Sequence, residues 1–220
     1  MNPRHIVFAA LALSTVCGSA TALPNLITNG GFESDNFGSG FTTITSGLTG
    51  WTIDYGSIDG INSYWQPAEG KNSIDLFGNS RGKISQVINT VVGQQYTVTY
   101  YQSYNPDFTD NTRTLLLGVN GDNIDTTINQ LFNFSTVRTR SNMQWEFVST
   151  GFTAQDALTT ISFRGGSTAD NEFFGPAMDD VVITGPAAVP LPGVLGLMLV
   201  GLAGIGFSNK KRQSALANQS

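Results

Sequence analysis

The sequence predicts an all-β domain, an antiparallel β-sandwich or jelly roll, flanked by a signal at each end of the chain. Segments rich in β-branched and aromatic residues recur along residues 23–186, and clusters of Gly, Asn, Asp and Pro separate them. Outside the two ends, no stretch of ten or more residues repeats its apolar positions with the period of a helix. These patterns favour two packed antiparallel sheets.

One expected strand shows the alternation of a half-buried sheet very clearly. In "QQYTVTYYQSY", residues 94–104, Tyr96, Val98 and Tyr100 alternate with residues suited to the opposite face. The composition of five other runs also predicts strands: residues 83–89, 114–119, 143–152, 158–165 and 177–184. The sequence Val-Asn-Gly-Asp at residues 119–122 predicts a hairpin turn. About 160 residues between the ends suit a single domain.

The first 22 residues have the layout of a secretory signal peptide. Arg4 precedes an apolar run at Ile6–Val16 and then small residues, which places the expected cleavage after Ala22. The run is shorter than the ~20 apolar residues that a transmembrane helix needs. Cleavage would remove His5 and Cys17, the single His and the single Cys. That excludes disulfides, Ser-His-Asp triads and His- or Cys-ligated metals from the mature domain.

The region between the ends is acidic. All 16 Asp and Glu residues lie between Glu33 and Asp180, whereas only 7 of the 11 Lys and Arg residues do, which leaves this region a net charge of −9. No basic stripe interrupts it. Nucleic acid is therefore not an expected partner.

Residues 187–212 predict a membrane-spanning sorting signal, and residues 213–220 a polar tail. Ala187 begins a run of 21 uncharged residues, long enough to span a bilayer, and Lys210, Lys211 and Arg212 follow on the side expected to be cytoplasmic. Five glycines between residues 193 and 206 disfavour the alternative of a water-soluble core helix.

The order of Val-Pro-Leu-Pro, apolar segment and basic cluster resembles the PEP-CTERM sorting signal of Gram-negative bacteria that make extracellular polysaccharide. One position departs from it, because Leu191 stands between Pro190 and Pro192 where that signal carries Glu. The resemblance implies export through the inner membrane and processing by an exosortase-type protease. The protein would then reside at the cell surface or in the extracellular matrix, after a transient single-pass membrane stage.

Five blocks of the domain resemble the bacterial choice-of-anchor C domain: "NLITNGGFES" at 25–34, "GWTI" at 50–53, "SYWQPAEGKNSIDLFGNSRGKISQ" at 63–86, "RSNMQWEF" at 140–147 and "GPAMDDVVIT" at 175–184. That family is related to plant cell-wall domains of unknown function and, more distantly, to galactose-binding-like carbohydrate-binding modules. The resemblance implies a galactose-binding-like sandwich but no particular activity.

In galactose-binding-like sandwiches the first and last of these blocks lie side by side, and their carboxylates share a structural Ca²⁺. Carried over, this resemblance nominates Glu33 and Asp179 as calcium ligands, with backbone oxygens completing six to eight ligands. Asp180 is the alternative to Asp179, because successive strand residues point to opposite faces. The competing interpretation is that Glu33 caps a turn and both aspartates are solvated.

A possible sugar site begins at residue 64. Tyr64 and Trp65 offer flat faces for sugar rings, Gln66 and Glu69 supply hydrogen bonds together with the neighbouring Lys71 and Asn72, and Tyr104 could extend the surface along with Tyr101 and Asn105. The competing interpretation makes Trp65 a core plug and the tyrosines a cover over the sandwich rim. Trp51 and Trp145 are expected in the core.

The expected function is non-catalytic: a carbohydrate-binding or exopolysaccharide-associated protein, with an extracellular or cell-wall polysaccharide as partner. One alternative is a purely structural surface or biofilm protein without a sugar site. The other is a glycosidase with two carboxylates about 5 Å or 6.5–9.5 Å apart. No spacing selects a pair from its candidates: Asp54, Asp59, Glu69, Asp75, Asp107 and Asp110.

Overall fold

The computed structural model describes residues 23–107, 113–120, 128–131, 137–167 and 173–185. All of them belong to the first of the chain's two units, Met1–Gly185. The expected signal peptide and the sorting residues Pro190, Pro192, Lys210, Lys211 and Arg212 lie outside the described residues. Within the described ranges, no helix has the length and apolar character to cross a membrane.

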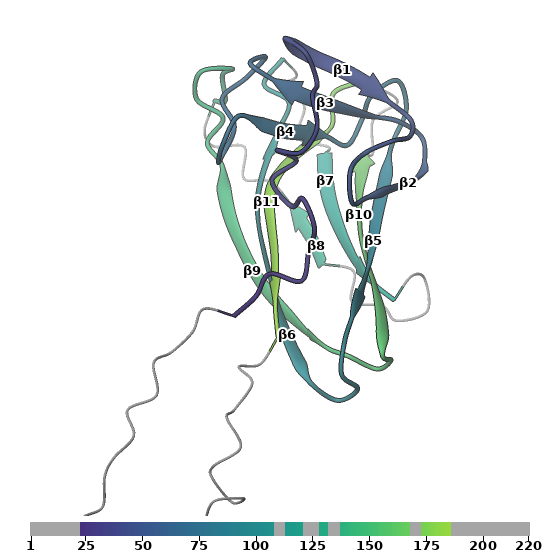
Figure 1. The fold of residues 1–220 in the computed structure, drawn as a ribbon. Helices are drawn as coiled ribbons and strands as arrows, with labels where there is room; N and C mark the ends of the chain where they lie inside the picture. Colours follow the sequence, from purple (N-terminus) through teal and green to yellow (C-terminus); the bar gives the residue numbers. More distant parts are fainter. Residues whose placement is uncertain (1–22, 108–112, 121–127, 132–136, 168–172, 186–220) are drawn as a thin grey trace, which may run out of the picture. The chain divides into compact units, whose positions relative to one another are not determined.

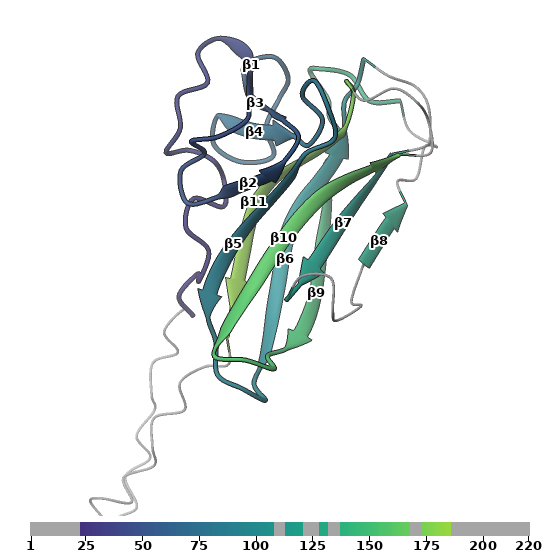
Figure 2. The same ribbon diagram turned by 90° about the vertical axis from the view of Figure 1, so that its right-hand side faces the viewer.

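Two antiparallel sheets pack into a sandwich (Figure 1), which confirms the predicted fold class. The six strands of sheet A are, in spatial order, β1 (Gly40–Ile44), β3 (Ile58–Asn62), β4 (Asn72–Asp75), β11 (Pro176–Thr184), β6 (Gln95–Tyr104) and β9 (Glu146–Thr153). The five strands of sheet B are β2 (Thr52–Tyr55), β5 (Lys83–Asn89), β10 (Leu158–Ser167), β7 (Arg113–Val119) and β8 (Ile128–Leu131). Figure 2 shows the two sheets one behind the other.

All six predicted strands are present, as β5, β6, β7, β9, β10 and β11. After Val119 the chain returns in β8, which pairs antiparallel with β7, while residues 121 and 122 of the predicted turn lie outside the described residues. The prediction did not include the short strands β1, β2, β3, β4 and β8. The reason is plain in β4, where Asn, Ser, Ile and Asp are all buried, so no apolar and polar alternation marks the strand.

The hydrophobic core lies between the sheets and follows the predicted alternation. Tyr96, Val98 and Tyr100 of β6 are buried in it, together with Phe163 of β10 and the predicted core residue Trp51. The Phe163 ring makes edge contacts with both Tyr100 and Trp51, at centroid distances of 5.1 and 6.1 Å. Aromatic residues from both sheets therefore hold the sandwich together.

Sheet A carries a second, smaller apolar cluster on its outer face, the face turned away from the core. Ile61 of β3 and Ala177 of β11 pack there against Trp65 and Met143, with Tyr64 and Trp145 partly buried beside them. In this part of the sheet, Asp59 pairs with Asp75 and Asp75 pairs with Ala177 across neighbouring strands. Side chains opposite each other on adjacent strands share a face, so both aspartates lie on the outer face.

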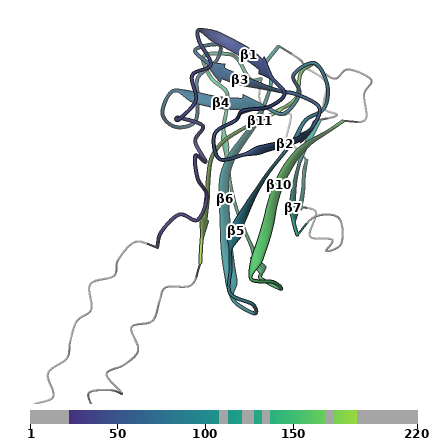
Figure 3. The same cartoon turned by 45° about the vertical axis from the view of Figure 1, so that its right-hand side comes forward.

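The short strands β1, β3 and β4 gather at one end of the molecule (Figure 3). Both ends of the described chain leave the domain elsewhere, away from these strands. The outer face near β1 and β3 is therefore clear of the described chain ends.

Candidate functional site

The N-terminal segment runs beside the last strand, as the resemblance implied. The amide of Leu26 donates to the carbonyl of Ile183 at 2.8 Å, and the amide of Val181 donates to the carbonyl of Gly30 at 3.0 Å. A Cβ atom at Gly30 would lie 1.9 Å from the Val181 oxygen, so only glycine permits this approach. Glu33 and Asp179 are brought close together as a result.

Glu33 and Asp179 both hold one turn, residues 66–72, which we call the capped turn. Glu33 Oε1 accepts from the amides of Lys71 and Asn72, both at 2.8 Å. Asp179 Oδ2 accepts from the amides of Ala68 and Glu69 at 2.9 and 3.1 Å. Burial raises the pKa of Asp179 to about 7, although these hydrogen bonds favour its charged form.

Gly70 allows the capped turn to approach Glu33. Its φ is +61°, and a Cβ atom there would stand 2.3 Å from Glu33 Oε1. The hydrogen bonds of Glu33 therefore match the turn-capping role that was one of its two interpretations from sequence.

The calcium prediction involves these same carboxylates. Glu33 Oε1 and Asp179 Oδ2 each already accept two amide hydrogens, and Asp179 Oδ1 accepts from the amide of Asp180 at 2.7 Å. Asp180 sits at a bulge with a φ of 47°. Among the described residues, no three acidic, His or Cys side chains form a group that could hold a metal. Calcium binding by Glu33 and Asp179 stays a prediction.

Trp65 and Tyr104, two of the predicted sugar-stacking residues, are buried. Trp65 is 3% exposed, and its indole N–H donates to Ser73 Oγ at 2.9 Å. Tyr104 is 7% exposed, with the Arg138 guanidinium 4.3 Å above its ring. Packing on the outer face of sheet A buries both side chains, and sugar binding by these rings stays a prediction.

Gln66 and Glu69, the predicted polar ligand residues, are exposed on the capped turn. The backbone of Gln66 accepts from Trp145 Nε1 at 3.0 Å and donates to the carbonyl of Arg140 at 2.8 Å. Trp145 is thus partly buried on the outer face and not in the main core. Neither Gln66 nor Glu69 lines the pocket described next.

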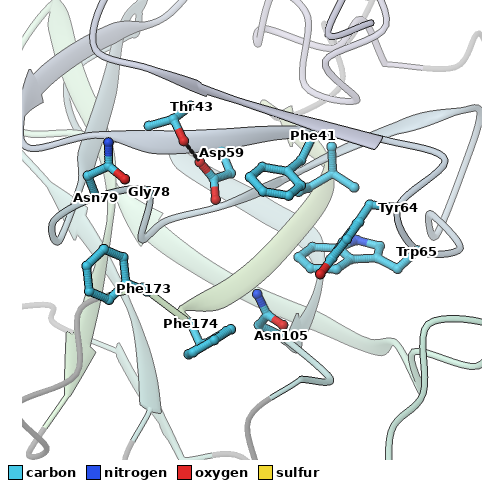
Figure 4. A pocket seen from close by; sticks show the side chains of 11 residues that line it. Phe41, Thr43, Asp59, Tyr64, Trp65, Gly78, Asn79, Asn105, Phe173 and Phe174 are labelled. Atoms are coloured by element: carbon cyan, nitrogen blue, oxygen red, sulfur yellow. Dashed lines mark hydrogen bonds between the residues drawn. The ribbon is translucent and has the colours of Figure 1, made fainter. Parts of the chain in front are cut away.

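A pocket of about 190 Å³ opens on the outer face of sheet A beside β1 and β3 (Figure 4). Phe41, Tyr64 and Trp65 stand on one side of it, and Phe173 and Phe174 stand on the other. Phe41 and Phe173 are 48% and 57% exposed. The remaining lining residues are Thr43, Asp59, Ile61, Gly78, Asn79 and Asn105. Of the predicted ligand residues, the structure places Tyr64 and Trp65 here.

Tyr64 is held in the pocket wall by an ion pair. Its hydroxyl donates to Asp107 Oδ2 at 2.6 Å, and the Arg140 guanidinium lies 3.9 Å from the centre of its ring. Arg140 also donates to both Asp107 oxygens, at 3.0 and 2.7 Å, and these hydrogen bonds lower the pKa of Asp107. Phe41 completes the wall with an edge contact to Tyr64 at 5.0 Å.

Asp59 supplies the acidic group of the pocket. The Thr43 hydroxyl donates a short hydrogen bond to its Oδ1, while its second oxygen points into the open part of the pocket (Figure 4). The residue is 8% exposed, and burial raises the pKa of Asp59 while the Thr43 hydrogen bond opposes that rise. An oxygen in this position can accept hydrogens from a ligand.

Asp75 lies behind the pocket and supports it. This fully buried carboxylate accepts from the amide of Phe77 at 2.8 Å, from the amide of Gly175 at 3.2 Å and from Asn105 Nδ2 at 3.0 Å. Burial raises the pKa of Asp75 to about 7. Asp75 holds Asn105 directly. It also holds the backbone of Gly175, which directly follows Phe173 and Phe174, so it supports both sides of the pocket.

Of the glycosidase candidates, Asp59 and Asp75 are cross-strand neighbours on β3 and β4. Asp54 is on β2 with Lys83 and Ser85, Asp107 pairs with Arg140, Glu69 is on the capped turn and Asp110 lies outside the described residues. Among the candidates that the structure describes, only Asp59 lines the pocket.

The structure adds Phe41, Phe173 and Phe174 to the residues that the sequence nominated. The usable signal was a pair of adjacent phenylalanines directly before the last block that resembles the choice-of-anchor C domain, "GPAMDDVVIT". No pattern in the sequence could link that pair to Phe41, which lies more than a hundred positions away.

The fold is similar to those of solved carbohydrate-binding modules. A family 61 carbohydrate-binding module, solved in complex with β-1,4-galactotriose, aligns with 74% of this chain and 99% of its own, at 13% identity and a TM-score of 0.48. A family 22 xylan-binding domain from Paenibacillus barcinonensis aligns with 78% of this chain and all of its own, at 15% identity and a TM-score of 0.45. Both scores are too low to carry an inference about ligands.

Halomucin of Haloquadratum walsbyi is 40% identical over 95 residues, which are 39% of this chain and 1% of that protein. The chain therefore spans a very small part of this relative.

Residues 25–184 match a family described as "Protein of unknown function (DUF642)". The match covers nearly the whole sandwich and includes every residue of the pocket. The choice-of-anchor C assignment and the sorting signal stay predictions. The broader expectation, a domain of unknown function of the plant cell-wall type, is confirmed, and the chain belongs to the DUF642 family.

Proposed function

We propose that this protein is a non-catalytic carbohydrate-binding protein and that the pocket on the outer face of sheet A is its sugar site. The observation that carries the proposal is the combination of exposed aromatic rings on opposite sides with hydrogen-bonding groups between them. Phe41 and Phe173 supply the rings, and Asp59 and Asn79 supply polar groups. Sugar rings present apolar C–H faces and hydroxyl edges, so they match such a lining.

The pocket is held in shape before any ligand arrives. Tyr64 is fixed by Asp107 and Arg140, and Asn105 is fixed by Asp75. A preformed site loses little conformational entropy on binding, which favours affinity for a small, flexible sugar.

The lining also supports a non-catalytic role. Hydrolysis of a glycosidic bond by two carboxylates requires both to reach the bond. Among the described lining residues Asp59 is the single carboxylate, and Asp75 behind it is fully buried with three N–H donors.

The proposed setting is the cell surface or extracellular polysaccharide matrix of a Gram-negative bacterium, reached by export and sorting through the C-terminal signal. The partner in that setting would be a polysaccharide, and an exosortase-type protease would process the tail. The pocket is lined by residues of β1 and β3. Figure 3 shows these strands away from the places where the described chain ends leave the domain.

The burial of Trp51 and Trp65 favours a second candidate, a purely structural matrix protein without a sugar site. A glycan array followed by calorimetry on the purified protein separates the two. We expect binding, and we expect Phe41→Ala to weaken it by about 1–2 kcal/mol, roughly tenfold, because the exposed ring loses its contact with the sugar.

Phe147→Ala is the matched control, since Phe147 is also exposed, at 61%, but lies on β9 outside the pocket. A folded protein that binds no glycan would favour the structural role. Equal weakening by the two substitutions would remove the pocket from the proposal.

A further inference from the structure

We propose that the pocket takes one uncharged sugar ring at the end of a glycan chain, and that the open oxygen of Asp59 selects it by accepting its hydroxyl hydrogens. This inference rests on the proposed function and specifies the ligand class of the same site. Asp59 is more than nine-tenths buried, has one oxygen occupied by Thr43 and directs the other into the pocket (Figure 4).

The size of the pocket limits the ligand to a single ring. Its volume of about 190 Å³ is smaller than the roughly 300–1,000 Å³ of pockets that enclose drug-sized ligands. Aromatic side chains stand on both sides of this space, with Phe41 facing Phe173 and Phe174 across it (Figure 4). A single terminal ring fits between such walls, and we infer that the rest of the glycan chain stays outside the pocket.

The charge of the pocket disfavours acidic sugars. No Lys or Arg is among the described lining residues, and the nearby Arg140 is already paired with Asp107. Asp75, the cross-strand neighbour of Asp59, adds a second carboxylate behind it. A uronic acid would bring its own carboxylate toward these groups without a cation to balance it, and such uncompensated like charges are a strong source of specificity.

The geometry of Asp59 favours hydroxyl donors. A carboxylate oxygen accepts hydrogens and cannot donate them when ionised. Thr43 already satisfies Oδ1 and holds the side chain in place, so the second oxygen is the acceptor that a ligand must satisfy. An uncharged sugar presents neighbouring hydroxyl groups that can do so, and a charge-assisted hydrogen bond of this kind is roughly twice as strong as a neutral one.

The test uses calorimetry on the purified protein with neutral di- to hexasaccharides of galactose, glucose and mannose, and with galacturonic acid oligosaccharides of the same lengths. We expect one of the neutral series to bind with a Kd that is independent of chain length beyond the disaccharide. We expect the galacturonic acid series to bind at least tenfold more weakly.

Asp59→Asn should weaken binding of the neutral ligand tenfold or more. The amide is uncharged, and it presents the ligand either with a weaker acceptor oxygen or with an NH₂ donor in place of the carboxylate oxygen. Asp54→Asn is the control, since Asp54 is an exposed aspartate on sheet B that does not line the pocket. The comparison of neutral and acidic ligands uses the unsubstituted protein, so it decides the matter even if Asp59→Asn does not fold.

Two results would overturn the inference and leave carbohydrate binding intact: equal affinity for acidic and neutral ligands, or affinity that rises steadily with chain length. Unchanged binding by a folded Asp59→Asn protein would also overturn it. Failure of every glycan to bind would instead overturn the proposed function itself.

Discussion

The capped turn and the pocket both depend on a pair of carboxylates near the outer face of sheet A, yet the two pairs serve different ends. At the capped turn, Glu33 and Asp179 accept five backbone amide hydrogens between them. At the pocket, Asp75 accepts three N–H groups, but Asp59 accepts only the Thr43 hydroxyl and keeps one oxygen open.

If Asp59 binds a ligand as proposed, donor supply, and not burial, separates a structural carboxylate from a binding one. Asp179 and Asp59 are both buried, at 0% and 8% exposed. A buried carboxylate whose oxygens meet backbone amides is part of the fold, because its removal leaves those amides without an acceptor. A buried carboxylate with an oxygen facing a pocket is available to a ligand.

The largest effect that would test this distinction is expected from Asp75→Ala. It strips three buried N–H groups of their acceptor, at about 1–3 kcal/mol for each unsatisfied group, so we expect the free energy of unfolding to fall by about 3 kcal/mol or more. Urea denaturation followed by tryptophan fluorescence measures it. Asp59→Ala, which affects one hydroxyl, should cost about 1 kcal/mol; similar losses in the two variants would contradict the distinction.

An intermediate effect is expected from pH. Burial raises the pKa of Asp179 to about 7 from 3.8, so between these values the folded state keeps a proton that the unfolded state has lost. The stability from this group is therefore complete below about pH 4 and is lost as the pH rises through about 7. One such group contributes a slope of at most about 1.4 kcal/mol per pH unit.

Urea denaturation between pH 4.5 and 8 checks this slope, with Asp179→Asn as the matched variant, because asparagine keeps an acceptor oxygen but does not titrate. We expect the fall in stability with pH to be shallower in the variant. Asp75 titrates in the same direction, so part of the slope should persist. Identical slopes in the two proteins would mean that Asp179 does not carry the proton.

The smallest effect concerns Glu33 and calcium. If calcium binds to Glu33 and Asp179, the midpoint temperature of unfolding should rise with free calcium and fall on addition of EDTA, because a ligand of the folded state stabilises it by mass action. Glu33→Gln keeps an oxygen for the amides of Lys71 and Asn72 but removes a charge. We expect it to abolish the calcium response while changing the midpoint in EDTA only slightly.

Scanning calorimetry in calcium and in EDTA decides this point. A midpoint that does not respond to calcium in the unsubstituted protein would leave the amide hydrogen bonds of the capped turn as the role of both carboxylates.

Composition and apolar alternation suffice to predict the sandwich and its longer strands. The lack of His and Cys between residues 23 and 186 rules out the chemistry that needs these side chains. The alternation around Tyr96, Val98 and Tyr100 predicts one buried face of a strand, because successive side chains point to opposite faces. The resemblance of the "NLITNGGFES" and "GPAMDDVVIT" blocks to a family placed Glu33 and Asp179 near each other, and the hydrogen bonds along Leu26 and Val181 confirm this neighbourhood.

Which residues form the candidate site could be seen only in the tertiary structure. Phe41, Asp59 and Phe173 come from three distant segments, and strand pairing together with the support of Asp75 brings them to one pocket. The same packing covers Trp65 and Tyr104, which composition alone made attractive as sugar platforms. Exposure and hydrogen bonding depend on which segments pack over a side chain in the folded protein. The alternation of residues along a strand predicts only which face of the sheet the side chain is on.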